Sequence, residues 1–275
     1  MAGGSLAPWL ALREDADAGA RSTELVQRLR SLLDEHRPAV IHDLGCGTGS
    51  MGRWLAPRLP GPQHWVLHDR DPDLLRRAAA NFPGAAAGGA AVTVRTRHGD
   101  VTRLAPADGA APLAGATLVT ASALLDLLTA DGLEQLVAAC VSARCSALVT
   151  LSVTGSVELS PAEPLDARVG AAFNDHQRRA TAAGRLLGPD AVEAAVTAFR
   201  RAGAQVLVRP SPWRLGSADR ALAGSWFAGW VAAAVEARPE LHAPTRGYVG
   251  RRLTALRAGR LAVTVHHADL LAVPS

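Results

Sequence analysis

The residues with the clearest chemical potential lie between positions 39 and 50, where the sequence reads Ala-Val-Ile-His-Asp-Leu-Gly-Cys-Gly-Thr-Gly-Ser. A short β-branched run, Val40 and Ile41, predicts a buried strand, and the stretch 50–59 predicts a helix. Between them stand three glycines at alternate positions, Gly45, Gly47 and Gly49. Glycine allows positive φ and leaves no Cβ between ligand and backbone, and the first amides of the helix face the same space. The pattern therefore predicts a ligand-binding loop.

The spacing of these glycines argues against a phosphate cradle. A dinucleotide fingerprint reads Gly-x-Gly-x-x-Gly and a phosphate loop ends in Gly-Lys-Ser/Thr. Here the glycines alternate, and the chain contains no lysine, because all 29 basic residues are arginine. Asp43 stands two positions before the first glycine, at the end of the strand. A carboxylate there could bind an ammonium group or orient a water molecule. Because the glycine spacing differs from the dinucleotide fingerprint, a dinucleotide oxidoreductase ranks below the alternatives.

The pattern Asp43-x-Gly45-x-Gly47-x-Gly49 resembles motif I of the class I S-adenosylmethionine-dependent methyltransferases, a Rossmann-like family. The resemblance implies an α/β fold with a doubly wound, mostly parallel seven-stranded sheet. It also implies S-adenosyl-L-methionine as the cofactor and S-adenosyl-L-homocysteine as the product. In that family the loop backs onto the amino-acid end of the cofactor. Asp43, the three glycines and Cys46 are therefore expected to bind it.

Further donor contacts are expected at the ends of the following strands. Asp69 ends the second predicted strand, about 20 residues past the loop, where this kind of fold holds a nucleoside ribose. The adjacent Arg70 is placed along the adenine. The resemblance implies that Asp100 and Val101 hold the adenine amino group and a ring nitrogen, and the order of the motifs favours this role over a plain polar loop. Ser122 falls at the end of the fourth predicted strand, near the methyl group.

The N-terminal segment carries two arginines that could reach this edge of the sheet. Leucines and a tryptophan between positions 9 and 33 fit one apolar face, and Ser22 can start a helix running to about His36. A segment preceding the first strand could lie across the carboxyl edge of the sheet. Arg13 and Arg21 are then candidates for binding the cofactor carboxylate or an acidic substrate. For Arg13, a solvated helix face is at least as good an interpretation.

Composition and the order of the elements predict one globular methyltransferase domain over 1–275, with 48% hydrophobic residues and a net charge of +4. Within it we expect an N-terminal helical cap (1–37), a cofactor-binding half (38–153), a lid-like insertion (154–187) and a substrate-side half with the last strands (188–275). The insertion is inferred because 154–164 looks like a connection, whereas the alternating fold would need only about 2–6 residues there.

The same composition excludes several kinds of partner and site. No basic run with interleaved aromatic residues suggests a nucleic-acid partner. The three cysteines form no Cys-x-x-Cys, which argues against a zinc site or a disulfide framework, so no metal is expected. No leader-like start and no run of about 18 apolar residues is present, so we expect a cytoplasmic protein without a membrane partner.

The acceptor side offers fewer signals. His176 is the leading candidate for a general base, with Asp175 and Asn174 placed to orient its ring, although a histidine in a polar loop is usually only solvated. Asp126 interrupts an apolar run and faces the substrate or caps the next helix. Trp213 follows a proline-rich turn and is expected to be exposed to the substrate. His266 and His267 in a late strand are interpreted as structural.

The predicted function is methyl transfer to a small-molecule acceptor, in secondary metabolism, by in-line displacement. The cofactor brings its own electrophile, so the protein mainly aligns donor and acceptor and excludes water. A base is needed only where the acceptor must lose a proton. An RNA or protein methyltransferase ranks second, and a non-catalytic scaffold or regulator is the remaining alternative. The acceptor atom and a homodimeric assembly stay open.

Overall fold

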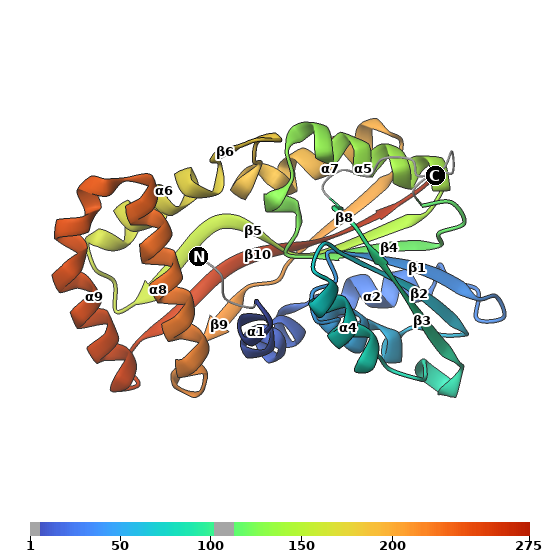
Figure 1. Cartoon of the computed structure of the whole chain (residues 1–275), viewed down its shortest axis with the longest axis horizontal. Coiled ribbons are helices and arrows are strands. Elements are labelled where there is room, and N and C mark those ends of the chain that lie inside the picture. Colours follow the sequence, from blue (N-terminus) through green and yellow to red (C-terminus); the bar gives the residue numbers. More distant parts are fainter. Residues whose placement is uncertain (1–5, 102–112) are drawn as a thin grey trace.

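The computed structural model describes residues 6–101 and 113–275, which form an eight-stranded sheet with helices on both faces (Figure 1). The strand order is β3-β2-β1-β4-β5-β10-β8, and β9 pairs with β10 beyond this path. The neighbours from β3 to β5 are parallel, whereas β10 runs antiparallel to β5, β8 and β9. The bounds of the strands are β1 Ala39–Leu44, β2 Gln63–Asp69, β3 Val92–His98, β4 Leu118–Ser122, β5 Ser146–Ser160, β8 Gln205–Pro210, β9 Trp213–Leu215 and β10 Ala262–Val273.

The predicted doubly wound, mostly parallel sheet is thus confirmed, with one addition. The stretch 210–215 was expected to be a turn only, but Trp213–Leu215 is a short strand on β10. The brief hairpin β6 Ala180–Thr181 and β7 Gly184–Arg185 forms a separate two-stranded sheet.

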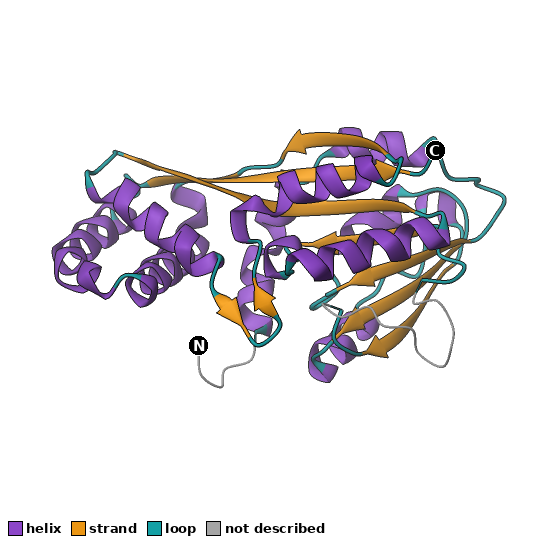
Figure 2. Cartoon of the chain, turned by 90° about the horizontal axis from the view of Figure 1, so that it is seen from above, coloured by secondary structure: helices purple, strands orange, loops and turns teal. Residues whose placement is uncertain are grey.

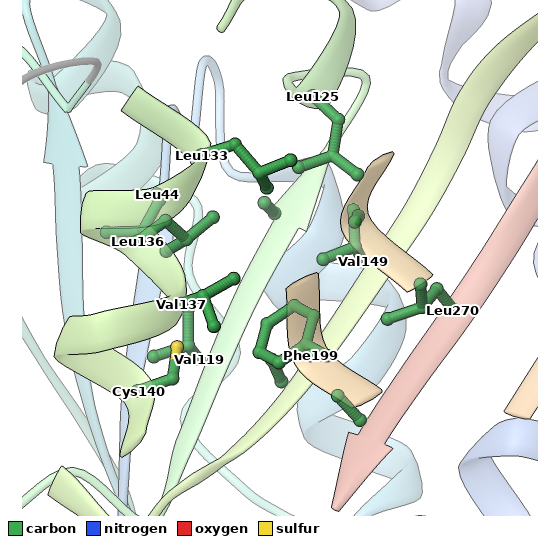
Figure 3. Close-up of a cluster of buried hydrophobic side chains, with 14 of the residues drawn as sticks. Leu44, Val119, Leu125, Leu133, Leu136, Val137, Cys140, Val149, Phe199 and Leu270 are labelled. Carbon is green, nitrogen blue, oxygen red and sulfur yellow. The ribbon is translucent and has the colours of Figure 1, made fainter. Parts of the chain in front are cut away.

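Two layers of helices cover the sheet. On one face α2 (Thr23–Arg30), α3 (Ser50–Leu55) and α4 (Pro72–Ala80) pack into one core. On the other face α5 (Ala130–Ala143) and α7 (Ala191–Arg201) pack against the strands. Figure 3 shows α5 and α7 side chains, Leu136 and Phe199 among them, directed toward Val119 and Val149 of the sheet. Short 3-10 segments complete the described helices: η1 Ala56–Arg58, η2 Ala87–Gly89, η3 Leu125–Leu127, η4 Gly188–Asp190, η5 Ser217–Asp219 and η6 Pro239–Leu241.

The second helix is shorter than predicted. Ser22 caps α2 by accepting from the Leu25 amide, as expected, but the helix ends at Arg30 and not near His36. The side chain of Asp34 accepts from the His36 amide at 2.9 Å. An aspartate that accepts from the backbone two residues later favours a turn over a helix, so the helix does not reach His36.

Residues 154–160 are strand and not a connection, so this part of the sequence prediction was wrong. β5 continues to Ser160, which pairs with Ala262 of β10. Exposed and partly buried positions alternate along this extension, but its glycine and serine residues conceal the strand pattern in the sequence. The extended ribbon carries α6 (Leu165–Gln177), α8 (Arg220–Ala237) and α9 (His242–Arg257), which share a third core. Figure 2 shows these helices grouped at one end of the molecule.

Helix α1 (Ala7–Ala20) joins this helical group to the sheet. It contacts α8 and β9 on one side and α3 on the other. Glu14 of α1 forms an ion pair with Arg53 of α3 at 2.7 Å. The predicted helical cap over the first strand therefore contains two helices, of which α1 bridges two parts of the chain that are distant in sequence.

Asp269 of β10 is the best-connected buried carboxylate at the carboxyl edge of the sheet. Its side chain accepts hydrogen bonds from the Ser22 amide at 2.7 Å, the Leu151 amide at 2.8 Å and the Ser211 hydroxyl at 2.5 Å. The pairing of β10 with β5 shifts register next to Asp269, and Leu151 has a φ of 57°. A bulge of this kind re-aims side chains. Asp269 thus fastens the start of α2, the bulged β5 and the link between β8 and β9.

Within the described residues, every helix is too short or too polar to serve as a membrane span.

We predict that Asp269→Ala lowers the free energy of unfolding by about 3 kcal/mol, because three donors lose their acceptor in a buried site. Urea denaturation followed by circular dichroism measures this loss. Ser211→Ala is the matched control, because it removes one of the three bonds and should cost only about 1 kcal/mol. Equal losses of unfolding free energy in the two variants would show that Asp269 does not hold the three segments of this edge together.

Candidate active site

The loop after β1 has the backbone that the glycine pattern predicts. Gly45, Gly47 and Gly49 have φ values of 65°, 55° and 86°, in the left-handed region that favours glycine. A Cβ built on Gly47 would lie 3.0 Å from Leu10 of α1, and one on Gly45 would lie 3.2 Å from Leu124. The loop is therefore packed between α1 and the segment that follows β4. A side chain at Gly47 would press on Leu10, and one at Gly45 would press on Leu124.

Asp69 ties this loop to the next strand and helix. Its Oδ2 accepts from the Gly47 amide at 2.9 Å, and its Oδ1 accepts from the Asp71 amide at 3.0 Å. Each carboxylate oxygen keeps a second lone pair that a ribose hydroxyl could use. Asp71 caps α4 by accepting from the Asp73 and Leu74 amides. The side chain of Arg70 is exposed beside this site, and the ribose and adenine roles of Asp69 and Arg70 stay predictions.

Asp43 is fully buried under the loop. Its Oδ1 accepts from the Thr120 hydroxyl at 2.7 Å, while its Oδ2 has no hydrogen-bond partner in the part of the chain that the structure describes. Burial raises the pKa of Asp43 to about 7. Burial also raises the pKa of the Cys46 thiol, so Cys46 is a small buried side chain and not a nucleophile at neutral pH.

Arg21, at the end of α1, is the cation nearest to this carboxylate. Only 3% of the residue is exposed, and its guanidinium lies 5.4 Å from the Trp54 ring centre. Its Nη2 donates to the hydroxyls of Ser50 and Ser122, at 3.3 and 3.2 Å. Nε and Nη1 have no partner among the described residues. Burying a guanidinium with two unpaired nitrogens costs free energy of folding unless an anion accepts hydrogen bonds from those nitrogens.

These features fit the two charged groups at the amino-acid end of S-adenosylmethionine. The orphaned Oδ2 of Asp43 can accept from an ammonium group, and the orphaned nitrogens of Arg21 can donate to a carboxylate. The glycine backbone leaves room for close approach. The structure thus brings together Arg21, Asp43, the glycine loop, Asp69 and Ser122, as the sequence predicts, while their binding roles stay predictions.

Asp100 and Val101 follow β3 at the same edge. The Asp100 side chain is exposed and Val101 is half-buried. They directly precede 102–112, which lie outside the described residues. Their predicted contact with the adenine stays a prediction.

Trp213 is buried, which corrects the expectation of an exposed aromatic residue. Only 3% of it is exposed, and its Nε1 donates to Asp17 of α1 at 3.0 Å. Arg13 lies 4.9 Å above its ring centre and holds Asp17 through two hydrogen bonds. The His267 ring meets Trp213 edge-on at 5.3 Å. Trp213 therefore anchors α1 to β9 and β10, and the solvated-face interpretation of Arg13 is wrong.

His267 was expected to be a satisfied structural histidine, and the structure satisfies its ring only in part, through the backbone of Ser211. Its ring is buried, and its Nδ1 has no hydrogen-bond partner among the described residues. Burial and the charge of Arg13 lower the pKa of His267 to about 3. Alternation along β10 distinguishes the two histidines: Val263, Val265 and His267 are buried, whereas His266 is partly exposed and binds Glu158.

Asp126 lies on η3, directly after β4, and it does not cap the following helix. The cap of α5 is Thr129, whose hydroxyl accepts from the Gly132 amide at 3.1 Å. Burial raises the pKa of Asp126, while the charges of Arg13 and Arg179 act in the opposite direction. The capping alternative is therefore wrong, and a role of Asp126 toward the substrate stays a prediction.

The three polar residues expected to form the catalytic lid lie on α6 and not on a loop. His176 lies 3.5 Å from Glu236 of α8, Asp175 accepts from Arg238 at 2.8 Å, and Asn174 donates to the Gly155 carbonyl at 2.9 Å. In Figure 1 the ribbon of β5 and β10 passes between α6 and α1. The roles of His176 and Asp175 in catalysis, and of Asn174 in substrate binding, stay predictions that these contacts do not support.

In the described ranges, no group of three or more histidine, cysteine, aspartate or glutamate side chains could hold a metal ion.

Comparison with known proteins finds a family match for the segment that contains strands β1 to β4. Residues 41–143 match a family model described as a methyltransferase domain. The biotin biosynthesis bifunctional protein BioCD of Bordetella avium (strain 197N) is 46% identical over 58 residues. That match covers 21% of this chain and 12% of the relative, so the aligned stretch is a small part of both proteins.

Solved structures of low sequence identity are similar along nearly the whole chain. A putative sarcosine dimethylglycine methyltransferase from Galdieria sulphuraria has a TM-score of 0.47 at 13% identity, with 97% of each chain covered. A SAM-dependent methyltransferase from Thiobacillus denitrificans, crystallised with S-adenosyl-L-homocysteine, has a TM-score of 0.47 at 13% identity, with 98% of each chain covered.

We predict that the affinity for S-adenosylhomocysteine falls as the pH is lowered through the pKa of Asp43, about 7. Above this pKa the carboxylate can accept from the ligand ammonium, whereas below it the protonated group loses the charge attraction. Calorimetric titrations on both sides of this pKa measure the effect. In Asp43→Asn the affinity should be weaker at high pH and nearly independent of pH. A flat profile in the unaltered protein would remove Asp43 from the ammonium site.

The matched segment 41–143 runs from β1 to the end of α5 and includes the glycine-rich loop, Asp69 and Ser122. The family is one whose cofactor is S-adenosylmethionine, and the buried groups around the loop are complementary to that molecule. Residues 41–143 are thus similar to a methyltransferase domain, within an α/β fold whose mostly parallel sheet has the predicted order.

Proposed function

We propose that the protein transfers the methyl group of S-adenosylmethionine to a small-molecule acceptor of secondary metabolism. The observation that carries the proposal is the pair of unsatisfied buried groups at the glycine loop, Arg21 and Asp43. Their unused atoms require an anion and a cation respectively, and the methionyl part of the donor contains both. A scaffold without a ligand would leave both groups unsatisfied in a buried site.

The donor supplies an electrophilic methyl group, and the residues of the chain position the two reactants. Helix α1 lies across the loop, where its Leu10 side chain is next to Gly47. Two further contacts hold the helix in this position. Glu14 binds Arg53 on the donor side, and Asp17 binds Trp213 on the other side. This arrangement favours exclusion of water from the reacting centre. It also favours in-line alignment of the two reactants, which lowers the free-energy barrier to methyl transfer.

A small acceptor is favoured over an RNA or a protein by the way α1 covers the site. Arg13 and Asp17 of α1 pack against buried residues of β9 and β10, Trp213 and His267. An acceptor bound under this helix would be largely enclosed, as small-molecule ligands are in their sites. A place in secondary metabolism, as opposed to a central pathway, is part of the proposal.

The function is tested by incubating the protein with tritium-labelled S-adenosylmethionine and three acceptor pools: small metabolites, total RNA and denatured protein. Label in the small-molecule fraction is the expected result. Label that depends on RNA and declines with added salt would favour the alternative of an RNA methyltransferase. Absence of calorimetric binding of S-adenosylhomocysteine would refute methyl transfer altogether.

We predict that Arg21→Met weakens S-adenosylhomocysteine binding by about 30- to 160-fold, as expected for loss of charged hydrogen bonds of about 2 to 3 kcal/mol. Binding of methylthioadenosine, which lacks the amino-acid part, should change little. Calorimetry with the two ligands measures the difference. Arg76→Met, at an exposed arginine of α4, is the matched control. Equal losses for both ligands would mean that Arg21 only supports the fold.

A further inference from the structure

We propose that His267 holds the acceptor, by accepting a hydrogen bond at Nδ1 from a hydroxyl or a neutral N–H group of that molecule. This inference rests on the proposed function and names the acceptor chemistry of the same site. It places the acceptor beside Trp213 and α1, and not at α6, where the sequence places His176.

The His267 ring has one nitrogen that the described residues do not use. Only 6% of the residue is exposed, and Nδ1 has no hydrogen-bond partner in the described ranges. The ring also forms a hydrogen bond to the backbone of Ser211, which must therefore involve Nε2. Because a carbonyl only accepts, the proton of the neutral ring lies on Nε2 and Nδ1 keeps a lone pair. Buried polar atoms are almost always paired, and a donor group of a bound acceptor would pair this one.

Three contacts fix the direction of this lone pair. The Ser211 amide donates to the His267 carbonyl at 2.9 Å, and the Ser211 hydroxyl donates to the buried Asp269 at 2.5 Å. The His267 ring meets the Trp213 ring edge-on, with the ring centres 5.3 Å apart. Trp213 is itself held by Asp17, which accepts from its Nε1 at 3.0 Å. Backbone and ring are both restrained, so Nδ1 is preorganised and little conformational freedom is lost when a donor binds to it.

Contacts along the same edge of the sheet connect His267 to the donor site. Asp269, two residues further along β10, accepts from the Ser22 amide at 2.7 Å. Ser22 directly follows Arg21, whose guanidinium donates to the Ser122 hydroxyl at 3.2 Å. Two residues of a strand span about 7 Å, so His267 lies close to the contacts that position Arg21. An acceptor bound to His267 is therefore at the edge where parallel sheets bind their ligands.

The surroundings of His267 favour a neutral donor group over a charged one. Arg13 lies 4.9 Å above the centre of the Trp213 ring that His267 meets edge-on. Burial and the charge of Arg13 lower the pKa of His267 to about 3, and they oppose an ammonium group at Nδ1 for the same reason. Asp17 accepts from Arg13 at 2.9 and 3.1 Å, so Arg13 needs no carboxylate from the acceptor. A hydroxyl or a neutral N–H group remains.

Helix α1 borders the approach to this nitrogen. Nδ1 is sealed from solvent, and the Trp213 ring beside it carries Arg13 and Asp17 of α1. Among the described residues no side chain caps α1, and a helix of 14 residues is marginally stable by itself in water. Displacing α1 from Trp213 therefore disturbs less structure than opening the sheet, so the acceptor enters on this side.

The tautomer is tested by heteronuclear NMR of the full chain with isotope-labelled histidine. At neutral pH His267 should show a protonated Nε2 and an unprotonated Nδ1. The variants His267→Gln and His266→Gln assign the signals of the two neighbouring histidines. A proton on Nδ1 would overturn the proposal, because that nitrogen would then donate and not accept.

The acceptor class is tested with phenol and toluene, which have the same size but differ in the donor group. In the protein saturated with S-adenosylhomocysteine, the ratio of the two affinities is measured by calorimetry. His267→Gln places an amide near the Nε2 position and keeps the bond to Ser211, so the ratio should fall about tenfold in this variant. His267→Asn places the amide near Nδ1 and should restore most of the ratio. His266→Gln is the matched control, because His266 is partly exposed and binds Glu158 at 2.9 Å.

Other outcomes would overturn the inference. An unchanged ratio in His267→Gln, or an equal fall in His266→Gln, would exclude His267 as the contact. Benzylamine, which is an ammonium ion at neutral pH, should bind more weakly than benzyl alcohol, and the reverse order would refute the neutral class. If the unaltered complex binds neither phenol nor benzyl alcohol, the acceptor class is wrong while the proposed function stands. Absence of S-adenosylhomocysteine binding would refute the proposed function itself.

Discussion

The buried carboxylate of Asp269 is the constraint on which the carboxyl edge of the sheet depends. It accepts from three donors that belong to α2, β5 and the link between β8 and β9. Burial of this charge raises its pKa, so the hydrogen bonds must offset a desolvation cost. They hold Leu151 in a left-handed conformation that an apolar side chain rarely adopts. Because the bulge sits where β5 leaves the parallel sheet, it also sets the course of the ribbon that carries the outer helices.

Helix α1 depends on this edge and in turn completes the site. Ser22, which Asp269 holds, follows the arginine that ends α1, so the anchor of α2 also places Arg21. The helix is fixed on one side by Glu14 and Arg53 and on the other by Asp17 and Trp213. It has almost no capping of its own and a weakly segregated apolar face, so these tertiary contacts position it. The glycine loop and the strands β9 and β10 thus share one covering helix.

The distribution of unsatisfied polar atoms links this architecture to chemistry. Buried groups in folded proteins are almost always paired, and exceptions need an explanation. Along the carboxyl edge such exceptions occur in Asp43 and Arg21 beside the glycine loop, and in Ser152 and His267 farther along β5 and β10. The first pair matches the charges of a methionyl group. The second pair lies near Trp213, whose ring contacts His267 and Arg13.

The sequence by itself determined the parts whose signals are local. The glycine spacing, Asp43 before it and Asp69 at the next strand end predict the loop and the sheet order, because a tight turn and a strand end depend on neighbouring residues. The role of Trp213 and the course of 154–160 were decided only by tertiary structure. Trp213 is buried because α1 packs on it, and residues 154–160 are strand because they pair with β10, about a hundred residues later in the sequence. Such contacts join segments that no local pattern relates, so only the folded chain brings Arg13, Trp213 and His267 together.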